Sequence, residues 1–209
     1  MHDYPVWLFD FDGTLIDTEE VILDCYREAA LGLWGRELPE AVVRENMSRT
    51  LREASQRVAG EQADSFFDAY VSHSLRRHAE SVFAYDGVTE MLWRLRDAGA
   101  RMGIVTSKLR PSVNLVLDQV SYGPAFEVIV TVEDTETHKP DPEPILHALR
   151  RMGVSPEMAI YVGDSPYDIM AARAAGVASG AALWGLHPPD DLLELWPDHA
   201  FASPAEVAA

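Results

Sequence analysis

Residues 6–15 read VWLFDFDGTL, and this stretch decides the fold. The four apolar residues Val6–Phe9 precede a glycine turn, which predicts a strand buried on both faces, as in a parallel sheet. Asp10 and Asp12 then lie at the carboxyl end of that strand, where open α/β sheets bind their ligands. Two carboxylates one residue apart repel each other unless a cation lies between them, so their spacing indicates a metal site.

The chain has 209 residues, enough for one large domain or for a core with a modest insertion. A hydrophobic share of 47% and a charged share of 24% are ordinary for a soluble globular protein. No apolar run reaches membrane-spanning length, and Met1–Pro5 lacks the basic flank and apolar segment of a secretory signal. We therefore expect a cytoplasmic protein with no membrane partner.

The formal net charge of −17 comes from 17 basic and 34 acidic residues. Nucleic acids need a basic footprint, so this charge argues against a nucleic-acid partner. Cys25 is the single cysteine, which excludes an internal disulfide and argues against a thiolate metal site. Lys108 and Lys139 are the only lysines in the sequence. Arginine supplies the other basic side chains, either from coding bias alone or because lysine is kept where a compact ammonium group is of use.

Residues 16–82 predict an all-helical insertion. After Leu15 the apolar spacing changes from that of a strand to that of a helix, and nothing from Asp17 to Ser81 has strand character. The helical patterns cover residues 19–33, 39–43, 51–58 and 63–75.

Beyond this insertion, strand and helix patterns alternate. Thr89 is expected to cap a helix that runs to Ala98, and Pro111 stands in the first turn of the next helix. Strand patterns cover residues 102–105, 128–132, 159–162, 177–183 and 199–201, and further helices cover residues 111–119, 142–152 and 167–175. This alternation predicts an α/β fold with a doubly wound parallel, Rossmann-like sheet. Residues 1–15 and 83–209 would form this core.

Four motifs carry a family resemblance. The sequence DFDGTLIDT at residues 10–18 resembles the first motif of the haloacid dehalogenase superfamily, most of whose members are magnesium-dependent phosphatases. Residues 106–108 (TSK), 138–142 (HKPDP) and 162–169 (VGDSPYDI) resemble its second, third and fourth motifs, each after a predicted strand. The resemblance covers essentially the whole chain, and it implies that residues 16–82 form a helical cap domain.

The second and third motifs offer groups for binding phosphate. The hydroxyl of Thr106 would bind a phosphoryl oxygen, Ser107 would add a backbone N–H, and Lys108 is a further substrate-binding candidate. Pro140 and Pro142 restrict the backbone next to Lys139 and start the following helix, so its ammonium group is held in place. The resemblance implies that Thr106 and Lys139 bind the equatorial oxygens of the transferring phosphoryl group.

The resemblance also implies roles for the aspartates. Asp10 would attack phosphorus and form an aspartyl-phosphate, and Asp12 would act as general acid and then as general base. Mg²⁺ would be held by a carboxylate oxygen of Asp10, the backbone carbonyl of Asp12 and a carboxylate of Asp164. Asp168 could be a direct metal ligand, a water-mediated one, or a group that orients Lys139. Dehalogenases of the superfamily lack the aspartate at the position of Asp12, so phosphorus chemistry is favoured.

Substrate choice is expected to lie with the cap, which closes over the core and excludes water in such enzymes. Residues 46–50 fall between two predicted cap helices, where Arg49 either grips a second anionic group of the substrate or is a solvated helix-start arginine. Residues 105–108 and 137–144 resemble the branch of phosphoglycolate phosphatases and cytoplasmic pyrophosphatases. The expected partner is therefore a small phosphorylated metabolite, bound by a monomer or a homodimer.

Two alternatives stay open on the sequence. A β-phosphoglucomutase-like phosphoryl transferase would pass the phosphoryl group to a sugar hydroxyl instead of water. A non-catalytic phosphate-binding protein on the same fold would have no need of a general acid beside a nucleophile, so the pair Asp10 and Asp12 argues against it.

Overall fold

A computed structural model describes residues 4–80 and 82–207; the ends of the expected core, residues 1–3 and 208–209, and residue 81 at the edge of the expected insertion lie outside the described residues. The predicted strand Val6–Phe9 is present as β1 and lies inside a six-stranded sheet of order β5-β4-β1-β6-β7-β8. All its strand pairs are parallel. The other strands are β4 (Arg101–Val105), β5 (Val128–Val130), β6 (Ala159–Gly163), β7 (Ala178–Ala182) and β8 (His199–Phe201). The doubly wound parallel sheet predicted from the sequence is thus confirmed.

Strand β1 is buried on both faces, as its apolar run predicts. Trp7 and Phe9 pack into one hydrophobic cluster, whereas Val6 and Leu8 pack into a second cluster on the other side of the sheet. Helices α5 (Val88–Asp97), α6 (Arg110–Val120) and α10 (Pro204–Val207) contribute to the first cluster, and α7 (Glu143–Met152) and α8 (Pro166–Ala175) to the second. Helix α9 (Pro189–Leu193) lies beside α8. The sheet is therefore the middle of three layers.

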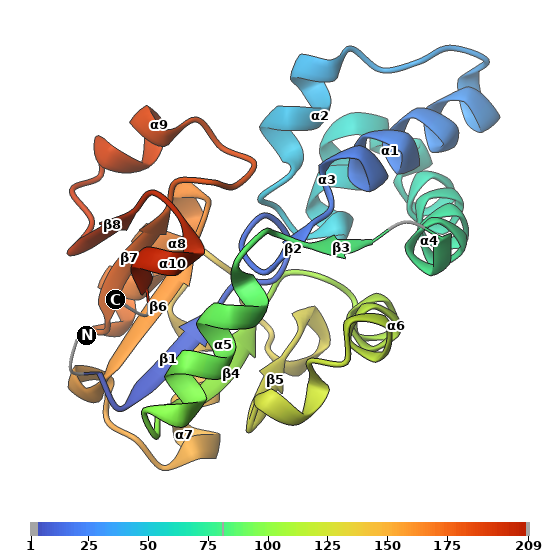
Figure 1. Cartoon of the computed structure of the whole chain (residues 1–209). Coiled ribbons are helices and arrows are strands. Elements are labelled where there is room, and N and C mark those ends of the chain that lie inside the picture. Colours follow the sequence, from blue (N-terminus) through green and yellow to red (C-terminus); the bar gives the residue numbers. More distant parts are fainter. Residues whose placement is uncertain (1–3, 81, 208–209) are drawn as a thin grey trace.

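Four helices between β1 and α5 form a separate group (Figure 1). They are α1 (Glu19–Trp34), α2 (Glu40–Asn46), α3 (Leu51–Ala59) and α4 (Ala63–Glu80). Tyr26, Val43, Ala54 and Phe66 are buried in their common core, which is distinct from the clusters of the sheet. Among the described residues, no helix is both long and apolar enough to cross a bilayer.

The chain leaves the sheet and returns to it through a small two-stranded ladder. Strand β2 (Ile16–Asp17) pairs antiparallel with β3 (Phe83–Ala84), so that Ile16 faces Ala84 and Asp17 faces Phe83. The prediction that nothing from Asp17 to Ser81 is a strand is therefore wrong at its first residue. Strands of two residues show no periodicity, so the sequence pattern could not indicate them.

Two other local predictions are corrected by the structure. Helix α5 begins after Gly87, which has φ +86°, and the hydroxyl of Thr89 is hydrogen-bonded to the hydroxyl of Tyr122 instead of capping the helix. Strand β5 ends at Val130 because Thr131 opens a short 3₁₀ turn, Val132–Asp134, through a capping box. Further 3₁₀ turns cover Gly60–Gln62, Gly123–Ala125 and Pro156–Met158.

Candidate active site

The site lies at the carboxyl ends of the central strands. Asp10 directly follows β1, Thr106 follows β4 and Asp164 follows β6. Because β4 and β6 flank β1 in the sheet, these three residues meet at one edge. Lys139 reaches the same place from the loop before α7, where a cis peptide bond joins it to Pro140. The sequence prediction that separate strand ends converge is confirmed.

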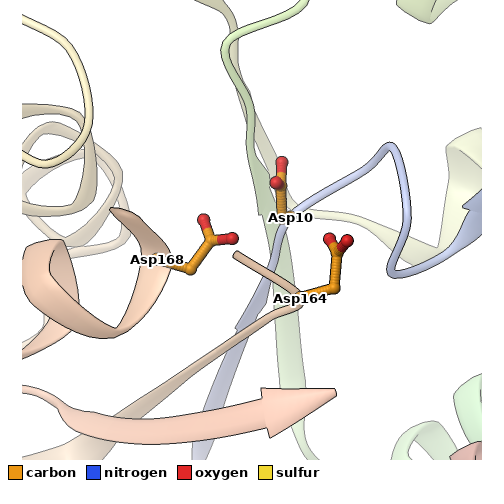
Figure 2. Close-up of side chains that lie close together, drawn as sticks. All are labelled: Asp10, Asp164 and Asp168. Atoms are coloured by element: carbon orange, nitrogen blue, oxygen red, sulfur yellow. The ribbon is translucent and has the colours of Figure 1, made fainter. Parts of the chain in front are cut away.

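Three buried carboxylates form the floor of the site. Asp10, Asp164 and Asp168 each offer an oxygen within 4.8 Å of the others, and Figure 2 shows their side chains close together. Burial, the main cause, raises the pKa of Asp10 to about 8. Attraction to Lys139 lowers this pKa, whereas repulsion from Asp168 and Asp164 raises it. Burial likewise raises the pKa of Asp164. The three carboxylates crowd together and offer only oxygen ligands. Such a set fits a hard divalent cation such as Mg²⁺.

Lys139 links two of these carboxylates. Its Nζ lies 2.9 Å from Oδ2 of Asp10 and 2.6 Å from Oδ1 of Asp168, and it donates to the hydroxyl of Tyr161 at 3.0 Å. Burial opposes the charge of Lys139, but attraction to the two carboxylates outweighs it and raises the pKa of the ammonium group. A charged ammonium group is therefore fixed beside the carboxylate of Asp10.

Asp168 has hydrogen-bond partners at both carboxylate oxygens. Oδ1 accepts from Lys139, and Oδ2 accepts from the backbone N–H and the hydroxyl of Ser165, at 3.0 and 2.6 Å. Ser165 in turn caps α8 through the N–H of Asp168, which completes a capping box. Gly163 leaves the room this arrangement needs, because a Cβ there would lie 2.3 Å from Cγ of Asp168. Asp168 thus joins the start of α8 to the ammonium group of Lys139.

Asp12 is paired with the other lysine of the chain. The Nζ of Lys108 lies 2.8 and 3.0 Å from the two carboxylate oxygens of Asp12. The backbone N–H of Lys108 donates to the hydroxyl of Thr106 at 3.2 Å, which ties the second motif to its own strand end. The sequence analysis proposed Lys108 as a substrate contact and did not foresee this ion pair.

Asp164 is held by groups that the sequence analysis missed. Its Oδ1 accepts from the hydroxyl of Thr14 at 3.0 Å, and its Oδ2 accepts from the backbone N–H of Leu186 at 2.8 Å. Gly13 and Gly185 pack so closely against it that a Cβ at either would lie within 2.2 Å of its atoms. Thr14 belongs to the first motif and could have been found there, whereas a backbone donor such as Leu186 leaves no signal in a sequence.

A small cavity of about 90 Å³ lies between this site and the helices α1–α4. It brings together every predicted site residue except Asp168, which lies behind Lys139. The guanidinium of Arg49 lies 5.5 Å from the ring centroid of Tyr167. Among residues 4–80 and 82–207, neither Nε of Arg49 nor the buried hydroxyl of Ser107 has a hydrogen-bond partner. The cavity residues from the sequence prediction are Asp10, Asp12, Arg49, Thr106, Ser107, Lys108, Lys139 and Asp164.

Comparisons with known proteins agree with this geometry. The family model for haloacid dehalogenase-like hydrolases matches residues 7–182. The chain is 36% identical to pyrophosphatase PpaX of Bacillus velezensis over 192 residues, which cover 92% of this chain and 89% of that protein. A structure from Lactobacillus plantarum, to which phosphoglycolate phosphatase activity is ascribed, is similar with a TM-score of 0.88 at 29% identity, over 98% of this chain and 97% of the other.

A second solved structure extends the likeness. A haloacid dehalogenase-like hydrolase from Bacteroides fragilis has a TM-score of 0.91 at 27% identity, over 98% of this chain and 99% of the other. The similarity therefore includes the sheet, the helices inserted after β2 and the strand ends that carry the four motifs. The chain belongs to the haloacid dehalogenase-like hydrolase family, as the resemblance of its motifs predicted.

Proposed function

We propose that this phosphatase of the haloacid dehalogenase-like family is a Mg²⁺-dependent hydrolase of a small, doubly anionic phosphate such as pyrophosphate or phosphoglycolate, and that Asp10 is its nucleophile. One observation carries the proposal. Asp10 faces a cavity with an ammonium group 2.9 Å from one of its oxygens and the carboxylate of Asp164 beside it. A carboxylate attacks phosphorus only when it is positioned and its charge repulsion is offset, and this arrangement does both.

Mg²⁺ would be held by carboxylate oxygens of Asp10 and Asp164 and by the backbone carbonyl of Asp12. The ion would neutralise charge between the nucleophile and the phosphate. Asp168 was predicted among the metal residues, and that role stays a prediction. Its two oxygens already accept hydrogen bonds from Lys139 and Ser165, which supports the alternative that it orients the lysine.

The proposed reaction has two halves. An oxygen of Asp10 forms a bond to phosphorus as the bond to the leaving oxygen breaks, and Asp12 donates a proton to that oxygen. Asp12 then takes a proton from water, whose oxygen attacks the aspartyl-phosphate and releases phosphate and the free carboxylate of Asp10. Lys108, 2.8 Å from Asp12, holds the acid and base group in place through both halves.

The transferring phosphoryl group would be bound by the hydroxyl of Thr106, the N–H of Ser107 and the ammonium group of Lys139. The hydroxyl of Ser107, which lies buried at the cavity, is available to the same oxygens. Arg49 and Lys108 line the same cavity and are the residues that would receive the second anionic group. We assign residues 16–82 to the cap domain that closes over residues 1–15 and 83–209.

The size of the cavity supports a small substrate. One water-sized sphere needs about 10–15 Å³, so 90 Å³ holds about six to nine such spheres. Space of this size favours a small phosphate such as pyrophosphate or phosphoglycolate over one with a bulky leaving group. The names of two similar proteins, a pyrophosphatase and a phosphoglycolate phosphatase, support the same two substrates.

The test is phosphate release with Mg²⁺ from pyrophosphate, 2-phosphoglycolate, sugar phosphates and an aryl phosphate. Asp10→Asn should lower kcat at least about a thousandfold on all of them while the far-ultraviolet circular dichroism stays unchanged. Asp118→Asn on the exposed side of α6 is the matched control and should keep wild-type activity. Normal turnover by Asp10→Asn would contradict the proposal. Transfer of the phosphoryl group to a sugar, with no free phosphate, would favour the phosphoryl transferase alternative.

A further inference from the structure

One hydrogen bond joins the cap to the core beside the catalytic cavity. Ser48 Oγ, in the loop between α2 and α3, lies 2.8 Å from Nε2 of His187, in the loop after β7. The other ring nitrogen of His187 lies 3.9 Å from an oxygen of Asp164, beyond hydrogen-bond distance. The sequence analysis assigned no role to either partner of this bond.

The loop that carries His187 is fixed to the core. The indole N–H of Trp184 donates to the backbone carbonyl of Thr14 at 3.0 Å, and the N–H of Leu186 donates to Asp164. A Cβ at Gly185 would lie 2.4 Å from the carbonyl oxygen of Gly13, so the loop backbone lies directly against the first motif. The loop that carries His187 is therefore anchored to the core, and the cap loop contacts it through the imidazole.

This contact separates two spaces of very different size. Met47, Ser48, Leu186 and His187 line both the catalytic cavity of about 90 Å³ and a groove of about 770 Å³ that also includes Tyr167. The two spaces therefore adjoin at these four residues, which we call the wall. The only hydrogen bond within this wall that the structure shows for the described residues is the one between Ser48 and His187.

We propose that Ser48 and His187 are specificity-determining residues that limit the substrate by size, through the wall that their hydrogen bond closes. The inference rests on the proposed function and deepens it. A small anion fits on the catalytic side of the wall, whereas a phosphate ester with a bulky leaving group needs space beyond it. Removal of the imidazole or of the serine hydroxyl joins the cavity to the groove and gives such a group room.

The experiment compares kcat/KM for 2-phosphoglycolate and for p-nitrophenyl phosphate, both with Mg²⁺. In His187→Ala the ratio of the aryl phosphate to phosphoglycolate should rise at least about tenfold, mainly through a lower KM for the aryl phosphate. Ser48→Ala should shift the ratio in the same direction. His187→Gln keeps a hydrogen-bonding group of similar reach and should return the ratio toward that of the wild type. His147→Ala on α7, which lines neither space, is the matched control.

The outcomes separate the inference from the proposed function. A ratio unchanged in both His187→Ala and Ser48→Ala, in a wild-type enzyme that hydrolyses phosphoglycolate, overturns the inference alone. A wild-type enzyme that hydrolyses no phosphate overturns both. If His187→Ala unfolds, Ser48→Ala decides the question, because it removes the same hydrogen bond and leaves the imidazole in place.

Discussion

Tyr161 connects the charged groups of the site although it belongs to a core strand. Its hydroxyl accepts from Lys139 and lies 2.8 Å from the carbonyl of Val105 and 3.0 Å from Oδ1 of Asp168. The side chain is fully buried, so its partners have no water to replace it. One phenol thus helps to orient both the lysine and the aspartate behind it.

We expect Tyr161→Phe to lower the free energy of unfolding by about 1–3 kcal/mol, because it leaves buried polar groups without this partner. It should also lower kcat more than it changes KM, since Lys139 loses one of its three contacts. Urea unfolding and steady-state kinetics measure the two effects. Tyr167→Phe, at a partly exposed ring beneath Arg49, serves as control. Equal stability in the two variants would contradict the role assigned to Tyr161.

The raised pKa of Asp10 predicts a dependence of stability on pH in the metal-free protein. Its pKa is about 8 in the folded chain and about 3.9 when unfolded. Between about pH 4 and pH 8 the folded state therefore holds a proton that the unfolded state has lost, and stability falls as the pH rises. Thermal unfolding in a chelator should show a smaller fall for Asp10→Asn than for the wild type. Mg²⁺ should reduce the difference, because the ion favours the ionised carboxylate.

Sequence patterns were a good guide to the polar residues at the strand ends. Asp10, Thr106 and Asp164 could be found because each directly follows an apolar strand, and parallel strands place their ends together. Tyr161 was missed because in an apolar strand it reads as core. His187 was missed because the sequence shows nothing of the cap loop that reaches it.

At the level of the element, the start of α8 both caps the helix and positions Lys139. Its capping box joins Ser165 and Asp168, and the same Asp168 holds Lys139. A second capping box at the start of α3 joins Thr50 and Glu53 in the cap, and Glu53 lines no part of the catalytic cavity. The two boxes therefore offer a matched pair, one with and one without a connection to the lysine.

Ser165→Ala should cost about 0.5–2 kcal/mol of unfolding free energy, and Thr50→Ala a similar amount. Only Ser165→Ala should lower kcat, because it frees Asp168 to move and Lys139 to follow. Thermal unfolding and phosphate release are measured for both variants. Equal kcat for Ser165→Ala and the wild type would show that the cap of α8 does not position the lysine.

The sequence also predicted most elements correctly, and its errors have local causes. Strand β1 was recognised because four apolar residues stand together before a glycine turn, and α1 because its stripe is long enough to show a helical period. The ladder of β2 and β3 was missed because it is too short. Thr89 was assigned as a helix cap because threonine is common at that position. In the structure its hydroxyl is hydrogen-bonded to the hydroxyl of Tyr122, which lies just after the end of α6.

For the molecule as a whole, the net charge of −17 predicts a response to salt. Like charges on a compact chain repel each other, and salt screens that repulsion. The melting temperature should therefore rise between about 0.01 and about 0.15 M NaCl, where the Debye length shortens from about 30 to about 8 Å. Calorimetric or fluorescence melts measure it. A melting temperature that is highest at the lowest salt would contradict this expectation.

The ladder of β2 and β3 has a consequence for how the molecule can be modified. Asp17 and Phe83 are strand neighbours, so the chain leaves the core and comes back at a single point. The closure entropy of such an excursion grows slowly with length, by about 0.6 kcal/mol for each doubling. Helices can thus be lengthened, shortened or exchanged between these two residues while the order of the sheet stays the same. The helices between these two residues are accordingly a unit that can be engineered apart from the strand ends that carry the four motifs.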